Sequence, residues 1–216
     1  MYNLKILKPQ KIQTSSLSLY FEEEGHKYYL IDREGVIKHT LPSVSQILQT
    51  CLVSFYVKKE LLAIAAARGT AVHRATEEWD KFGTESGLLQ LKGWKKFLDE
   101  YSVKINSVES CYFHKEYLYA GTIDRLVEID GEHHIIDIKS GVKADWHAVQ
   151  LSGYNHMLGL KYKRGCVYLD KEGGYKFIKY ERDEDHDAFI AALMIARWKG
   201  IWNPPKKRGR KKKSTS

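Results

Sequence analysis

The feature that most constrains the fold is a predicted β-hairpin in the segment "GTIDRLVEIDGEHHIIDIK". The Asp-Gly pair at its centre separates two β-rich runs, which is among the strongest short-range signals for a two-residue turn. Such a turn pairs Ile129 with Glu132, and the same register continued along both strands places Asp124 directly opposite Asp137. A four-residue loop keeps this register, whereas a bulge shifts it. The hairpin therefore predicts two carboxylates face to face within a sheet.

Opposed carboxylates in a sheet need a chemical reason, because like charges at directly paired positions destabilise it. The strand around Asp137 is rich in isoleucine, so the two acids require a proton or a cation between them. Mg²⁺ and Mn²⁺ prefer oxygen ligands of this kind. Lys139 lies two residues beyond Asp137 and projects from the same face, where its ammonium can orient a water or support charge on a phosphate. These residues suit metal-assisted phosphodiester hydrolysis. The alternative is a solvent-facing hairpin in which Lys139 and Arg125 offset the acids.

Composition favours an ordinary globular protein. With 216 residues, 43% hydrophobic and 12% aromatic, the chain suits one α/β domain. We expect residues 1–203 to form that domain. No apolar run approaches the length of a membrane span, and the N-terminus lacks the apolar core of a signal peptide, so we expect no membrane association and a cytoplasmic location. The three cysteines are far apart and form no metal-binding or disulfide spacing. Without a GxxxxGK[ST] loop, we expect no use of ATP.

The order of predicted elements is β-rich at the start, helical next, and then mixed. Short strands precede a helix that begins at Pro42 and Ser43. The helical pattern over 55–82 is expected to break into two helices at Gly69, with Thr70 capping the second. An amphipathic helix over 87–101 precedes strands between 107 and 139. A helix over 144–158, two strands and a last helix complete the domain.

The basic character of the chain lies mostly in its C-terminal tail. Seven positive charges stand in residues 204–216, which leaves about +1 for the rest of the chain. Such a run is too charged and too poor in apolar residues to fold by itself. It can bind a phosphate backbone or serve as a nuclear-localisation patch, and a solubility tail is an equal alternative. The candidate DNA-binding residues are Lys206, Lys207, Arg208, Arg210, Lys211, Lys212 and Lys213.

The ordered motifs resemble the PD-(D/E)XK nuclease superfamily, in its RecB-like and lambda-exonuclease-like branch. The resemblance rests on "GTIDR", then "DIK", then "QLSGY", with a helical histidine upstream in "RGTAVHRATEEW". It covers about residues 69–158, and "LPSVSQIL" is similar to an upstream segment of phage members. The resemblance implies an α/β restriction-endonuclease-like core with a central mixed sheet flanked by helices. The first motif is Gly-Thr-Ile-Asp rather than Pro-Asp, which is common in this branch.

The resemblance also implies roles for single residues. Asp124, Asp137, His73 and the main-chain carbonyl of Ile138 would hold Mg²⁺ or Mn²⁺, and Lys139 would serve the attacking water. Taken alone, a single helical histidine is more often a core or surface residue. The remaining roles fall on residues around this set. Gln150 and Tyr154 share a helix face near the scissile phosphate, Glu77 either orients His73 or forms a helix salt bridge, and Glu116 is either a second-metal ligand or a partner for Arg125.

These features predict a metal-dependent DNA nuclease, and an exonuclease of phage or bacterial DNA recombination or repair rather than a site-specific endonuclease. The absence of a cysteine quartet argues against an iron–sulfur cluster. A restriction-type or structure-specific endonuclease and a non-catalytic DNA-binding scaffold are the alternatives. Basic residues such as Lys58, Lys59 and Arg68 are candidates for a DNA path. A single-strand annealing protein is the expected partner of a phage exonuclease, and the oligomeric state is left open.

Overall fold

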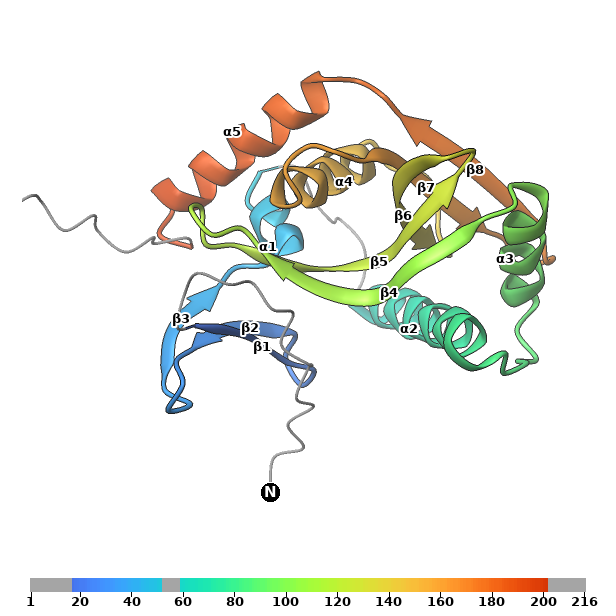
Figure 1. The fold of residues 1–216 in the computed structure, drawn as a ribbon, viewed down its shortest axis with the longest axis horizontal. Coiled ribbons are helices and arrows are strands. Elements are labelled where there is room, and N and C mark those ends of the chain that lie inside the picture. Colours follow the sequence, from blue (N-terminus) through green and yellow to red (C-terminus); the bar gives the residue numbers. More distant parts are fainter. Residues whose placement is uncertain (1–16, 52–58, 202–216) are drawn as a thin grey trace, which may run out of the picture.

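The computed structural model describes residues 17–51 and 59–201. This part of the chain forms a five-stranded mixed sheet flanked by helices, together with a three-stranded antiparallel sheet near the N-terminus (Figure 1). The α/β class predicted from the sequence is therefore confirmed. None of the helices in these two ranges is long and apolar enough to cross a bilayer. The predicted basic tail and Lys58 lie outside the described residues.

The small sheet is a meander of β1 (Ser18–Glu22), β2 (Lys27–Ile31) and β3 (Ile37–Leu41). Its apolar face packs on the large sheet, where Tyr28 and Leu30 contact Ala120. The short helix α1 (Val44–Gln49) follows, and a reciprocal capping box between Ser43 and Gln46 fixes its start. The predicted strands and the helix beginning at Ser43 are thus confirmed.

The large sheet has the strand order β4-β5-β6-β7-β8. Strands β6 and β7 are parallel, and the other neighbouring pairs are antiparallel. Helix α4 connects the parallel pair, as a crossover between parallel strands requires. The bounds of these elements are β4 (Lys104–Phe113), β5 (Ala120–Ile129), β6 (Glu132–Lys139), α4 (Trp146–Met157), β7 (Lys163–Leu169) and β8 (Tyr175–Tyr180).

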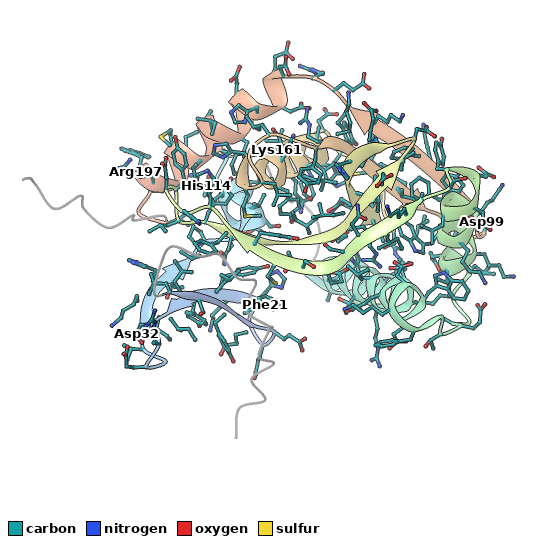
Figure 2. The ribbon with its side chains drawn as sticks, in the orientation of Figure 1. Phe21, Asp32, Asp99, His114, Lys161 and Arg197 are labelled. Atoms are coloured by element: carbon teal, nitrogen blue, oxygen red, sulfur yellow. The ribbon has the colours of Figure 1, made fainter. Side chains whose placement is uncertain are left out.

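Helices cover both faces of the large sheet (Figure 1). One apolar cluster joins α1, α4 and α5 (Glu184–Trp198) to the sheet, and it includes Leu126, Ile135 and Phe189. A second cluster joins α2 (Lys59–Phe82) and α3 (Leu89–Glu100) to the opposite face through Trp94 and Ile136. Figure 2 shows side chains filling the space between the sheet and both helical layers. The central strands β5 and β6 are consequently buried on both faces.

The predicted break at Gly69 is wrong, because α2 is one continuous helix of 24 residues. A glycine within a helix costs only about 1 kcal/mol relative to alanine, whereas a break would leave several backbone groups without helical partners. Thr70 is an interior residue of this helix rather than its cap. The C-terminal half of α2 is anchored by Val72, Ala75 and Thr76, which are all buried, and this anchoring favours a single rigid element.

Candidate active site

The β5–β6 turn sets the position of the two central acids. Asp130 and Gly131 form a two-residue loop with φ values of +53° and +78°, the left-handed conformation that a type I′ turn requires at both positions. The register runs from Ile129 opposite Glu132 to Arg125 opposite Ile136, as the sequence predicted. Both acids lie just beyond the last of these pairs, where the same register places them opposite each other.

Both acids are buried where the hairpin meets the adjacent elements. Asp124 is 7% exposed and Asp137 is 3% exposed. The Asp124 carboxylate reaches across the hairpin, and its Oδ2 accepts a hydrogen bond from the backbone N–H of Ile138 at 2.7 Å. The structure thus brings the two acids close together within the sheet, as the hairpin register predicted.

Asp137 belongs to a chain of polar contacts that runs onto α4. Lys139 Nζ lies 2.6 Å from Asp137 Oδ2, so the two side chains share one face of β6. The same ammonium donates to Gln150 Oε1 at 3.1 Å, and Gln150 Nε2 donates to the Tyr154 hydroxyl at 3.1 Å. Gln150 and Tyr154 are four residues apart and occupy one face of α4, as the sequence predicted. Four of the predicted catalytic residues are therefore connected in space.

Gly121, the first residue of the "GTIDR" motif, makes room for this chain. A Cβ atom at position 121 would lie 2.7 Å from Cε1 of Tyr154 and 3.5 Å from Val44 Cγ2. Real Cβ atoms do not approach a ring this closely, so any larger residue would push Tyr154 out of place. The glycine of the first motif therefore has a packing function that ties β5 to α4.

His73 brings a second group of possible ligands together around Asp124. Its Nδ1 lies 3.3 Å from Glu109 Oε1 and 3.6 Å from Asp124 Oδ2. One ligand atom from each of these three residues lies within 4.8 Å of the other two. An imidazole and two carboxylates are suitable donors for a divalent cation such as Mg²⁺ or Mn²⁺. Within residues 17–51 and 59–201, this is the one group of three such side chains that could hold a metal ion.

Glu109 is the site residue that sequence reasoning missed. It stands in β4 with a φ of +45°, a left-handed conformation that costs a non-glycine residue of order 1 kcal/mol or more. The β4–β5 register shifts between Ile105 and Ser107, and its continuation places Glu109 beside Asp124. No tight turn connects β4 to β5, so neither the shift nor the unusual φ has a sequence signal. Strained backbone of this kind is found most often at functional sites.

Arg125 holds Glu109 in this position from inside the protein. The arginine is fully buried, and its guanidinium donates to Asp80 Oδ2 at 2.6 Å, to Glu109 Oε1 at 3.0 Å and to Thr76 Oγ1 at 3.1 Å. Nη1 also donates to the Asp124 carbonyl at 2.7 Å. Asp80 in turn accepts a bond from the Trp94 indole at 2.9 Å. One guanidinium thus connects α2, β4 and β5.

The two remaining predicted residues around the metal site have other contacts. Glu77 pairs with Lys81 one turn along α2, which is the helix salt bridge considered from the sequence rather than a contact with His73. Glu116 is exposed in the β4–β5 connection, where its backbone N–H donates to His114. Of its two expected roles, that of partner to Arg125 is wrong, because Glu109 and Asp80 accept the hydrogen bonds of the guanidinium, and that of second-metal ligand stays a prediction.

Electrostatics at the site reflect an excess of buried acids. The Asp124 carboxylate, aided by Glu109, raises the pKa of His73 to about 9. Burial raises the pKa of both Asp124 and Asp137. Burial alone would lower the pKa of Lys139, but the Asp137 and Asp124 carboxylates outweigh it and the pKa is raised. Three carboxylates in a low-dielectric setting are stabilised by added positive charge, which a divalent cation supplies.

Comparison with known proteins gives similarity at the level of structure alone. No model of a protein family and no curated protein matches the chain. An alkaline exonuclease from Laribacter hongkongensis is 16% identical with a TM-score of 0.40, over 74% of this chain and 92% of that one. A phage-related exonuclease from Haemophilus somnus 129PT is 12% identical with a TM-score of 0.38, over 74% and 93%. At these values the chemistry of the site has to be derived from its own residues.

Proposed function

We propose that this protein is a metal-dependent deoxyribonuclease that hydrolyses phosphodiester bonds. The observation that carries the proposal is the convergence of His73, Glu109 and Asp124 next to the Lys139–Asp137 pair. Phosphodiester hydrolysis needs a divalent cation, a positioned water and a cation near the phosphate. All three requirements find residues of the right chemistry here. A cation with a purely structural role would not account for a lysine held at the same site.

Each residue has a proposed role that follows from its contacts. His73, Glu109 and Asp124 would hold Mg²⁺ or Mn²⁺, with Asp137 and the carbonyl of Ile138 as the further ligands that the motif resemblance implies. A bound cation would supply Lewis-acid activation of water and neutralisation of phosphate charge. Lys139 places an ammonium where charge develops on the phosphate. Gln150 and Tyr154 hold that ammonium in position through the hydrogen-bond chain on α4.

The proposed substrate is DNA, cleaved from an end in phage or bacterial recombination or repair. The motif resemblance supports an exonuclease, and the described part of the chain contains no evident recognition helix or paired zinc ligands. A cytoplasmic location, a single-strand annealing partner and DNA binding by the basic tail belong to the same proposal.

The test uses end-labelled linear duplex, linear single strand and covalently closed circular DNA, each incubated with Mg²⁺ or Mn²⁺. Wild type is compared with Glu109→Gln and Lys139→Met, and Glu77→Gln serves as the control because Glu77 pairs with Lys81 of its own helix rather than with the site. Degradation of linear DNA by wild type and the control, but not by the two site variants, supports the proposal. Cleaved circles would instead identify an endonuclease, and binding without cleavage would identify a scaffold.

A further inference from the structure

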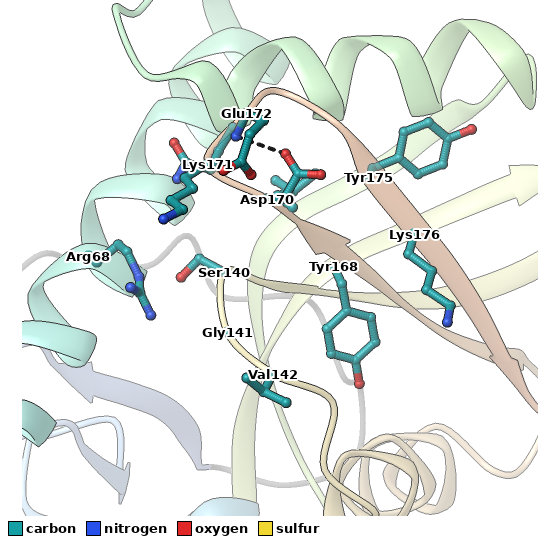
Figure 3. A pocket seen from close by; sticks show the side chains of 12 residues that line it. Arg68, Ser140, Gly141, Val142, Tyr168, Asp170, Lys171, Glu172, Tyr175 and Lys176 are labelled. Carbon is teal, nitrogen blue, oxygen red and sulfur yellow. Dashed lines mark hydrogen bonds between the residues drawn. The ribbon is translucent and has the colours of Figure 1, made fainter.

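A cavity of about 430 Å³ lies beside the proposed active site. Residues 140–142 line one side of the cavity, and they follow directly after Lys139, the last residue of β6. Tyr168 and the following turn close it from the end of β7, the parallel neighbour of β6. Figure 3 shows these segments together with Arg68 of α2 near Ser140. In open sheets, ligands bind beyond the carboxyl ends of parallel strands, which is where this cavity lies.

The charged residues of the cavity favour an anion. Arg68, Lys171 and Lys176 line it from three different segments, and none of them has an ion-pair partner within the described ranges 17–51 and 59–201. Asp170 belongs to the turn itself, because its Oδ1 accepts hydrogen bonds from the backbone N–H groups of residues 172 and 174 at 2.9 and 2.7 Å. Three cations thus face the cavity, with Glu172 as the one other acid in its lining.

The rest of the wall is mainly apolar, with Gln90 and Ser140 as its polar residues. Val142 exposes 91% of its surface, an unusual value for a valine beside a cavity. The Tyr168 ring is held in place because its hydroxyl bonds to His147 Nδ1 at 2.7 Å and to the Tyr180 hydroxyl at 2.8 Å. Tyr168 is 9% exposed, and together with the exposed Val142 side chain it offers apolar atoms that a sugar or a base can contact.

We propose that this cavity binds one nucleotide of the substrate strand, the nucleotide next to the phosphate held at Lys139. The cations contact its phosphate, and Tyr168 and Val142 contact its sugar and base. The volume is within the range of about 300–1,000 Å³ that small-molecule sites occupy, which suits a mononucleotide and is too small for a duplex. This inference rests on the proposed nuclease function, since it assigns part of the substrate to a specific pocket.

The test measures binding of a single nucleotide without metal, so that cleavage plays no part. Thymidine 5′-monophosphate, thymidine and inorganic phosphate are titrated calorimetrically into the full chain in the presence of EDTA. We expect the nucleotide to bind at least tenfold more tightly than either fragment. The double variant Lys171→Ala/Lys176→Ala should lose at least tenfold in nucleotide affinity. Both lysines are exposed, so we expect unchanged melting temperatures.

Lys161→Ala is the matched control, because Lys161 is an exposed lysine in the α4–β7 connection, at the other end of β7 (Figure 2). It removes one positive charge without touching the cavity, and its nucleotide affinity should equal that of wild type. Equal affinity in the double variant and the control would overturn the proposal, and so would the absence of nucleotide binding to wild type. If inorganic phosphate binds as tightly as the nucleotide, the proposed contacts of Tyr168 and Val142 with the sugar and base are refuted.

Failure of this inference is distinguishable from failure of the proposed function. A Mn²⁺ titration of the double variant should match wild type, because neither lysine contacts His73, Glu109 or Asp124. Conversely, Glu109→Gln should abolish cleavage of linear DNA while leaving nucleotide binding in EDTA within twofold of wild type. If the wild-type chain binds the nucleotide in the cavity but cleaves no DNA, the nucleotide-binding inference stands and the proposed nuclease function is refuted.

Discussion

Replacement of Arg125 should have the largest effect on stability among substitutions near the site. The Arg125 side chain is completely buried, and so is that of its partner Asp80. Arg125→Met removes the positive charge and leaves the Asp80 carboxylate buried with only the hydrogen bond from the Trp94 indole. Breaking a buried ion pair in this way costs about 3–5 kcal/mol, which is a large fraction of the 5–15 kcal/mol that stabilises a typical domain. Arg125→Lys keeps the charge but cannot reach all four acceptors, so we expect an intermediate loss of about 1.5–3 kcal/mol.

The assay is urea unfolding followed by tryptophan fluorescence, with Trp94 as a reporter beside the guanidinium. The free energy of unfolding comes from linear extrapolation, and an unchanged slope would show that the unfolded state is the same. Arg74→Met is the control on α2, the helix that carries Asp80, because the ion pair of Arg74 with Glu78 is exposed and its loss should give no measurable change.

Metal binding separates a structural role of Arg125 from a role at the site. At a temperature where Arg125→Lys is fully folded, its affinity for Mn²⁺ should fall severalfold, because Glu109 loses the donor that holds it. A destabilisation below about 1 kcal/mol for Arg125→Met, against the expectation for a buried pair, would refute this reasoning. So would a Mn²⁺ affinity of Arg125→Lys equal to that of the Arg74→Met control.

Three further predictions concern other parts of the fold. Gly121→Ala should destabilise the protein by about 1–3 kcal/mol through overpacking against Tyr154, and DNA cleavage should fall more than in a variant of equal stability elsewhere. Gly69→Ala should stabilise the protein by about 0.4–1 kcal/mol in thermal or urea unfolding, because a Cβ at position 69 meets no atom within 4 Å. The cleavage activity of this variant should equal that of wild type. Burial, with the neighbouring His114 and His186, lowers the pKa of His156 to about 4. Its contribution to stability is therefore full above the unfolded pKa of about 6.5 and is lost as the pH falls towards 4. Melting temperatures of His156→Gln should consequently depend less on pH over that range, and an identical pH dependence would count against the assignment.

The hairpin was predictable because its determinants are local. An Asp-Gly turn fixes the pairing of the residues around it, and the two-residue period of a strand then places Lys139 on the face of Asp137. No knowledge of the rest of the chain is needed for either step. The role of His73 could not be predicted from local sequence, because the packing of a helix decides whether a histidine on it faces the site. Only the motif resemblance indicated that His73 belongs to the site.

The missed features depend on tertiary structure. Glu109 reaches the site through a register shift and a left-handed backbone conformation, and its carboxylate is held there by Arg125 of the neighbouring strand. Gly69 was misread because glycine is a weak helix breaker, and packing of the C-terminal half of α2 outweighs it. The acid that most closely precedes the first motif in the sequence, Glu116, was therefore not the acid that the fold places beside Asp124.

The two-residue turn at Asp130 and Gly131 makes the site sensitive to chain length rather than to residue identity. Many substitutions along β5 and β6 would leave Asp124 and Asp137 opposite each other. One inserted residue in the turn would move one strand by a single step and turn every side chain beyond it to the other face. Evolution of this hairpin can therefore vary its composition widely, whereas an insertion or deletion of one residue would separate the acids in a single event.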